Sequence, residues 1–173
     1  MKEIFKFTQE QSRMLSEAAY DKLINNLMKY GNKPGDKQKE ALKKLIETLT
    51  AMAGGEISGR IAFPIPTGAG KTQSIVAFAS TLVEQGYNDV GIIVCASKVE
   101  ALCDLYRSLL NEGVPPEKLG LIHSYSFDKK KAEKYLIDRK ELPKGYASLP
   151  RTESNQHRQI LLATHQRIKG TDE

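Results

Sequence analysis

A glycine-rich loop between an apolar run and a helical pattern constrains the fold of this chain more than any other feature. Residues 61–65 form the apolar run, residues 66–72 read PTGAGKT, and residues 73–83 carry apolar side chains three and four positions apart. That spacing is typical of a helix. We therefore predict a strand, a tight loop and a helix in this order, which is the context that a phosphate-binding loop requires.

The residue types of this loop suit the binding of phosphate groups. Gly68 and Gly70 can adopt backbone angles that are closed to other residues, and they allow main-chain N–H groups to approach an anion. The start of the following helix adds unpaired N–H donors and the positive end of its dipole. Lys71 would reach the β- and γ-phosphates, and the Thr72 hydroxyl would hold a bridging Mg²⁺. The alternative is a chance glycine-rich turn before a helix.

Length and composition indicate an ordinary globular protein. The 173 residues suffice for a compact domain with a core, and 40% of them are hydrophobic and 27% charged. No stretch of eighteen apolar residues is present, and the first residues lack the apolar core of a signal peptide. We therefore expect no membrane partner and a cytoplasmic location. The net charge of +5 suits a nucleic-acid partner, although many basic proteins bind none.

The cysteines and histidines do not predict a metal site. Cys95 ends an apolar run and Cys103 lies in a helical pattern, so we expect both to be buried and reduced. No Cys-x-x-Cys pair accompanies them, and the three histidines are scattered along the chain.

Two helices are predicted ahead of the loop. Thr8 and Gln11 fit a capping box, and an apolar stripe follows for roughly twenty residues. The stripe consists of Met14, Leu15, Ala18, Ala19, Leu23, Ile24, Leu27 and Met28. Core packing and a pairing surface for another chain both remain open for it. Asp36 is the predicted N-cap of the second helix, which ends at Gly54-Gly55.

Apolar runs and helical patterns alternate after residue 60. Residues 90–95, 119–123 and 159–164 are predicted strands, and residues 97–110 and 129–137 are predicted helices. The continuous apolar run at 90–95 is typical of a strand covered on both faces. This alternation predicts an α/β fold with a parallel sheet and right-handed crossovers. Residues 139–158 form a long polar connection, which we expect to be mobile.

The segment PTGAGKT resembles motif I of the superfamily 2 helicases and translocases, of the DEAD/DEAH-like kind. Ile65 stands where the general loop pattern has its first glycine, and that superfamily commonly lacks this glycine too. Residues 95–102 are similar to motif Ia, with Ala96 in place of the usual proline, and residues 161–168 are similar to a later motif that contacts nucleic acid. Each of these segments follows a predicted strand.

The resemblance implies a fold and a set of sites. Residues 36–173 would be the N-terminal part of the first RecA-like ATP-binding domain, and residues 1–35 a helical extension. Gln38 is similar to a glutamine that reads the adenine edge, although a solvent-facing helix glutamine fits equally well. The implied ATP site, in which Thr72 binds Mg²⁺ and Lys71 and Thr72 are catalytic, is Gln38, Thr67, Gly68, Ala69, Gly70, Lys71, Thr72 and Gln73. The implied contacts to a DNA or RNA backbone are Ser97, Lys98, Thr164 and His165.

The resemblance covers only part of a motor. The Asp-Glu motif should follow a further buried strand, whereas Asp172-Glu173 follows a polar segment. We therefore expect the missing C-terminal motor region to be a partner, and we expect this chain by itself to bind nucleotide weakly without turnover. Two alternatives are a non-hydrolysing nucleotide-sensing or assembly module and a small P-loop kinase. The kinase is disfavoured because no acidic residue follows an apolar strand as a Mg²⁺ ligand.

Overall fold

The computed structural model describes residues 6–122 and 158–165. The chain divides into two compact units, Met1–Val90 and Gly91–Glu173. The predicted helix at residues 129–137, almost all of the polar connection at 139–158, and Asp172-Glu173 lie outside the described residues.

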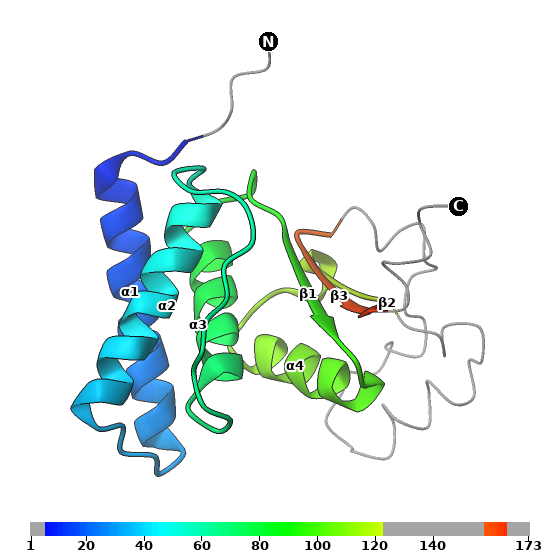
Figure 1. Cartoon of the computed structure of the whole chain (residues 1–173). Coiled ribbons are helices and arrows are strands. Elements are labelled where there is room, and N and C mark those ends of the chain that lie inside the picture. Colours follow the sequence, from blue (N-terminus) through cyan, green and yellow to red (C-terminus); the bar gives the residue numbers. More distant parts are fainter. Residues whose placement is uncertain (1–5, 123–157, 166–173) are drawn as a thin grey trace. The chain divides into compact units, whose positions relative to one another are not determined.

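The first unit is built from three helices, α1 (Gln9–Lys29), α2 (Asp36–Ala53) and α3 (Lys71–Glu84) (Figure 1). The predicted capping box starts α1. The Thr8 hydroxyl accepts from the Gln11 main-chain N–H at 3.1 Å, and the Gln11 side chain accepts from the Thr8 N–H at 2.8 Å. The N-cap of α2 is Gly35, so the prediction of Asp36 was wrong by one residue. Asp36 instead occupies the first turn, where its negative charge faces the helix dipole favourably.

The predicted stripe of α1 packs in the core of this unit. Leu15, Ala19 and Leu23 are fully buried, and α1 contacts both α2 and α3. Met14 and Met28, at the edge of the stripe, are about half exposed, at 51% and 54%. The core interpretation of the stripe therefore holds for its centre and not for its margin.

The strand predicted at residues 61–65 does not form. This segment has no strand partner within the described residues, and Ile61 remains 45% exposed. The main-chain N–H of Ile65 donates to the carbonyl of Phe63 at 2.9 Å, a local turn that replaces a strand ladder. An apolar pattern does not make a strand by itself, because its backbone groups need a neighbouring strand.

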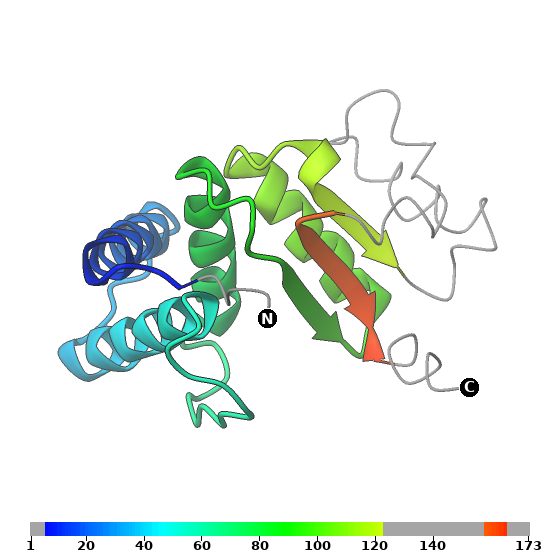
Figure 2. The same cartoon turned by 90° about the horizontal axis from the view of Figure 1, so that it is seen from above.

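The second unit contains an open parallel sheet. It comprises β1 (Ile92–Ala96), α4 (Val99–Asn111), a 3₁₀ turn (Pro116–Lys118), β2 (Leu119–Ile122) and β3 (Ile160–Thr164). The strand order is β1-β3-β2, both pairings are parallel, and α4 packs on all three strands (Figure 2). The predicted class, an incomplete α/β fold with a parallel sheet, is therefore confirmed.

The apolar sequence of β1 predicts a strand covered on both faces, and this prediction was wrong. Burial alternates along it, Ile93 is 62% exposed, and Cys95 is exposed as well. Both β1 and β2 are edge strands of the described sheet, yet every residue of β2 is buried, so the exposure of β1 does not follow from its edge position alone. The predicted burial of Cys95 was therefore wrong, while that of Cys103 on α4 is confirmed.

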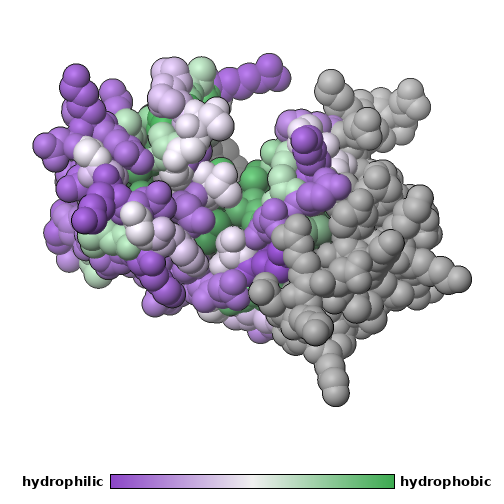
Figure 3. Space-filling view, turned by 90° about the horizontal axis from the view of Figure 1, so that it is seen from below, coloured by the Kyte–Doolittle hydropathy of each residue, from purple (hydrophilic) through white to green (hydrophobic). Residues whose placement is uncertain are grey.

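Much of the visible surface of the helical unit is hydrophilic (Figure 3). Among the residues that the structure describes, no helix combines the length and the apolar character needed to cross a membrane.

Candidate nucleotide-binding site

The glycine-rich loop adopts the backbone conformation that its composition predicts. Gly68 and Gly70 both have positive φ angles, +80° and +106°. Gly70 is the N-cap of α3, and no side chain caps the first turn of that helix. The N–H groups at the start of α3 therefore stand next to the loop without a capping oxygen.

Hydrogen bonds within the loop hold it closed. The Ala69 N–H donates to the Pro66 carbonyl at 3.3 Å. The ammonium group of Lys71 donates to the main-chain carbonyl of Ile65 at 2.8 Å. Thr67, Gly68, Lys71 and Thr72 are exposed, while Ala69, Gly70 and Gln73 are half-buried.

The helix α2 contacts the loop through Gln38 and Leu42, which lie one helical turn apart. The Gln38 side-chain amide donates to the Ala69 carbonyl at 3.0 Å. The side chain of Leu42 is fully buried, and its methyl carbons lie 3.4 and 3.5 Å from the place where a Cβ on Gly70 would stand. Gln38 thus contacts the loop itself, which neither sequence interpretation of this residue included.

Leu42 is the supporting residue that the sequence analysis did not assign to the site. The sequence does carry a signal for it, because Leu42 follows Gln38 by four residues and residues four apart lie on the same face of a helix. Which element that face contacts is a matter of tertiary packing, and the spacing does not reveal it.

The residues present fit an ATP–Mg²⁺ complex. The uncapped start of α3 offers main-chain donors and a positive dipole end to phosphate oxygens. Lys71 is exposed, so its ammonium can exchange the Ile65 carbonyl for a phosphate, and the exposed Thr72 hydroxyl is a hard oxygen ligand of the kind Mg²⁺ prefers.

The residues predicted to contact nucleic acid gather at one end of the sheet in the second unit. Ala96 and Thr164 are register partners of the parallel strands β1 and β3. Ser97 and Lys98 follow β1, and His165 follows β3. Ser97, Lys98 and His165 are all exposed.

Thr164 differs from its neighbours. It is only 5% exposed, and its hydroxyl finds no hydrogen-bond partner among the described residues. A buried hydroxyl usually has a hydrogen-bond partner. Because the Thr164 side chain is buried, it can contact a bound nucleic acid only if the end of the sheet rearranges.

The open parallel α/β sheet and the glycine-rich loop at a helix start define a helicase-like nucleotide-binding domain. The comparison with family models supports this class: residues 32–173 match the family described as type III restriction enzyme, res subunit. The chain belongs to this family, in agreement with its resemblance to the first RecA-like domain of superfamily 2 helicases. No curated protein and no solved structure gives a significant match.

Proposed function

We propose that this chain is the ATP-binding part of a nucleic-acid-dependent ATPase of the helicase or translocase type. One observation carries the proposal: the glycine-rich loop leads into the uncapped start of α3, where Lys71 and Thr72 are exposed. Family membership agrees with it.

The roles of the residues follow from their chemistry. The main-chain N–H groups of Gly68 and of residues 70–73 would bind the phosphates, Lys71 would compensate charge on the β- and γ-phosphates, and Thr72 would bind Mg²⁺. Thr67 and Ala69 complete the turn that presents these donors. Gln38 reads the adenine edge while it supports the loop through Ala69.

We further propose that the carboxyl ends of β1 and β3 bind the sugar–phosphate backbone of a nucleic acid. Ser97 and Lys98 supply a hydroxyl and a cation, and His165 a ring N–H, at neighbouring positions. Contacts of this kind hold a strand without reading its bases. The boundary at residue 35, the cytoplasmic location and the partnership with a C-terminal motor region stay predictions.

The test is equilibrium binding of Mg²⁺-ATP to the chain and to two charge-matched variants. Lys71→Ala should weaken binding at least about tenfold, because it removes the cation aimed at the phosphates. Lys44→Ala is the control, since it also removes one exposed lysine side chain. The main-chain carbonyl of residue 44, which accepts from the Thr48 hydroxyl, is retained in this variant. Equal losses in both variants would contradict the proposed site.

Turnover is measured on the same samples, with and without single-stranded nucleic acid. We expect binding without measurable turnover in this chain. If nucleic acid stimulates turnover and Lys71→Ala abolishes it, the group that positions the attacking water is already present in this chain. Binding without any response to nucleic acid, in a chain joined to its motor region, would favour the nucleotide-sensing module.

A further inference from the structure

A side chain near the end of α1 lies directly under the glycine-rich loop. A methyl carbon of Leu27 is 3.7 Å from the place where a Cβ on Gly70 would stand, and the two methyl carbons of Leu42 are 3.4 and 3.5 Å from the same place. Leu27 is only 5% exposed and Leu42 is fully buried. Gly70, the N-cap of α3, therefore lies against one apolar side chain from α1 and one from α2.

The helix α1 lies ahead of the residues that the family comparison covers. The match spans residues 32–173, whereas α1 ends at Lys29. Leu42 thus belongs to the matched part of the chain and Leu27 does not. Membership in the family assigns no role at the nucleotide site to α1, although α1 supplies one of the two side chains under Gly70.

Further contacts hold α1 against α3. The two helices pack on one another more extensively than α2 and α3 do. Near the end of α3, the Lys22 ammonium donates to the Glu84 carboxylate at 2.7 Å and to the Ser80 hydroxyl at 3.5 Å. Lys22 and Leu27 therefore connect α1 with both ends of α3, and the position of α1 is coupled to that of the first turn of α3.

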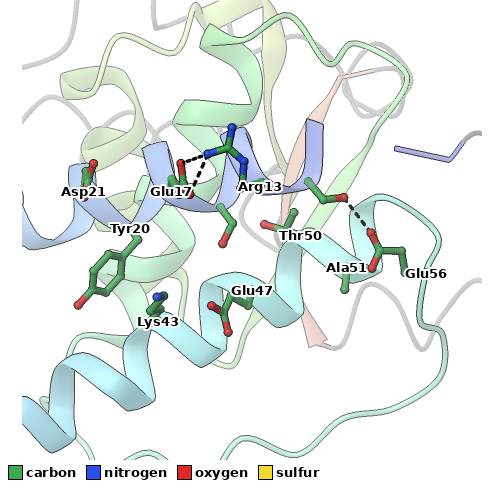
Figure 4. Close-up of a pocket in the computed structure, with 11 residues that line it drawn as sticks. Arg13, Glu17, Tyr20, Asp21, Lys43, Glu47, Thr50, Ala51 and Glu56 are labelled. Carbon is green, nitrogen blue, oxygen red and sulfur yellow. Dashed lines mark hydrogen bonds and ion pairs between the residues drawn. The ribbon is translucent and has the colours of Figure 1, made fainter. Parts of the chain in front are cut away.

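The first half of α1 has a different environment (Figure 4). A groove lies there between α1 and α2, and nearly all the residues that line it have polar side chains. The Ser12 hydroxyl donates to the Glu56 carboxylate at 2.8 Å, which connects the start of α1 with the segment after α2. Leu27 does not line this groove. The apolar contact with the loop is thus a property of the last turns of α1.

We propose that α1 is a positioning element of the nucleotide site and that Leu27 is the residue through which it acts. This role rests on the proposed function, because it requires the loop to bind phosphate groups. Leu27 fills the space under Gly70 and so keeps the N–H groups of the first turn of α3 in one arrangement. A void in its place would remove the contacts that hold Gly70 there. Donors that are already ordered in the free chain cost less to order when a ligand binds.

The coupling must act in both directions. If docking of α1 raises the affinity for nucleotide, bound nucleotide stabilises the docked α1 by the same factor. Mg²⁺-ATP should therefore slow hydrogen exchange at amides 26–29 of α1 more than at amides 13–16, although the proposed site contains no residue of α1. General stabilisation of the fold would protect both groups of amides alike.

The experiment compares Leu27→Ala with Leu15→Ala in the full chain, by equilibrium binding of Mg²⁺-ATP and of inorganic triphosphate. Leu15 is the matched control, because it is fully buried on the same helix and twelve residues away, roughly 18 Å along the axis. Both variants should be less stable than the unmodified chain, so binding is measured where circular dichroism shows each of them folded. Leu27→Ala should weaken both ligands about five- to tenfold, and Leu15→Ala should leave both affinities unchanged.

Two further variants separate positioning from a general loss of stability. Leu27→Met nearly conserves the side-chain volume, so it should recover most of the affinity that Leu27→Ala loses. Leu27→Val and Leu15→Val make a smaller change at the same two positions and replace the alanine pair if that pair does not fold. A loss of about two- to threefold is expected for Leu27→Val alone.

The binding data also distinguish this role from the proposed function itself. If the unmodified chain does not bind Mg²⁺-ATP, the proposed function is wrong and the role of Leu27 fails with it. If the unmodified chain binds, and substitution of Leu27 and of Leu15 weakens binding equally, the proposed function stands and Leu27 serves only the core. Equal protection of amides 26–29 and 13–16 by Mg²⁺-ATP would likewise overturn the coupling between α1 and the loop.

Discussion

Gly70→Ala tests the backbone geometry on which the candidate nucleotide site depends. Gly70 has φ +106° and ψ 11°, whereas the left-handed region open to other residues is centred near φ +57°. An alanine held at the observed angles would cost about 1–3 kcal/mol. Its new Cβ would stand 3.4 Å from the nearest methyl carbon of Leu42, an ordinary van der Waals distance. Packing therefore adds little, and we expect a loss of about 2 kcal/mol, nearly all of it backbone strain.

Gly68→Ala is the matched comparison. Its φ of +80° is closer to the allowed left-handed region, and no atom lies within 4 Å of a Cβ built on it. We expect a loss of about 1 kcal/mol. The order of the two variants, with Gly70→Ala the less stable, depends only on the two φ angles and on the absence of a steric clash.

The assay is urea unfolding followed by far-ultraviolet circular dichroism, with Mg²⁺-ATP binding measured on the same proteins. An alanine at 70 would relieve its strain by rotating toward φ +60°, and this rotation would change the angle between the loop and the first turn of α3. Gly70→Ala should therefore also lose nucleotide affinity. Unchanged stability of Gly70→Ala, or a larger loss in Gly68→Ala, would refute the left-handed start of α3.

Three further outcomes follow from local features. Thr8→Ala should lower the free energy of unfolding by about 0.5–2 kcal/mol, and Thr8→Ser should retain most of it, because the hydroxyl caps α1; urea unfolding measures both. Burial raises the pKa of Tyr106 above 10.0, so above about pH 10 the unfolded chain loses this proton while the folded chain keeps it, and the free energy of unfolding falls as the pH rises. Tyr106→Phe should remove this part of the decline, which unfolding measured between about pH 8 and 11 would show. Cys95 is exposed and Cys103 is 3% exposed, so a thiol reagent should modify Cys95 first; a Cys95→Ser variant that still reacts rapidly without urea would contradict the burial of Cys103.

Features determined by neighbouring residues in the sequence could be predicted. The capping box at Thr8 and Gln11 needs only residues three apart, and it forms as predicted. The positive φ angles of the loop follow from the positions of its glycines, and four helices begin and end within a few residues of their predicted bounds. The parallel class of the sheet followed from the alternation of strands and helices.

Features determined by distant partners could not be predicted. Residues 61–65 have the composition of a buried strand, but strand formation requires a neighbour whose position no local pattern encodes. The same applies to β1, whose apolar sequence indicated cover on both faces while Ile93 remains 62% exposed. Thr164 was assigned to a nucleic-acid contact from a motif, and its burial depends on how the carboxyl ends of the strands pack.

In the proposed site, the Gln38 side chain could contact both the loop and the nucleotide. A glutamine amide carries two N–H donors and a carbonyl with two lone pairs. In the structure one donor is used by the Ala69 carbonyl, at 3.0 Å, and no other side-chain bond of Gln38 is found among the described residues. One donor and the carbonyl therefore remain, and an adenine edge offers a matching acceptor and donor. Reading the base does not require Gln38 to release the loop, whereas Lys71 must exchange the Ile65 carbonyl for phosphate. Gln38→Glu, which has no N–H donor when ionised, should therefore weaken the binding of inorganic triphosphate through the loop and weaken the binding of ATP further through the base. A loss confined to ATP would show that Gln38 acts on the base alone, and equal losses would show that it acts on the loop alone.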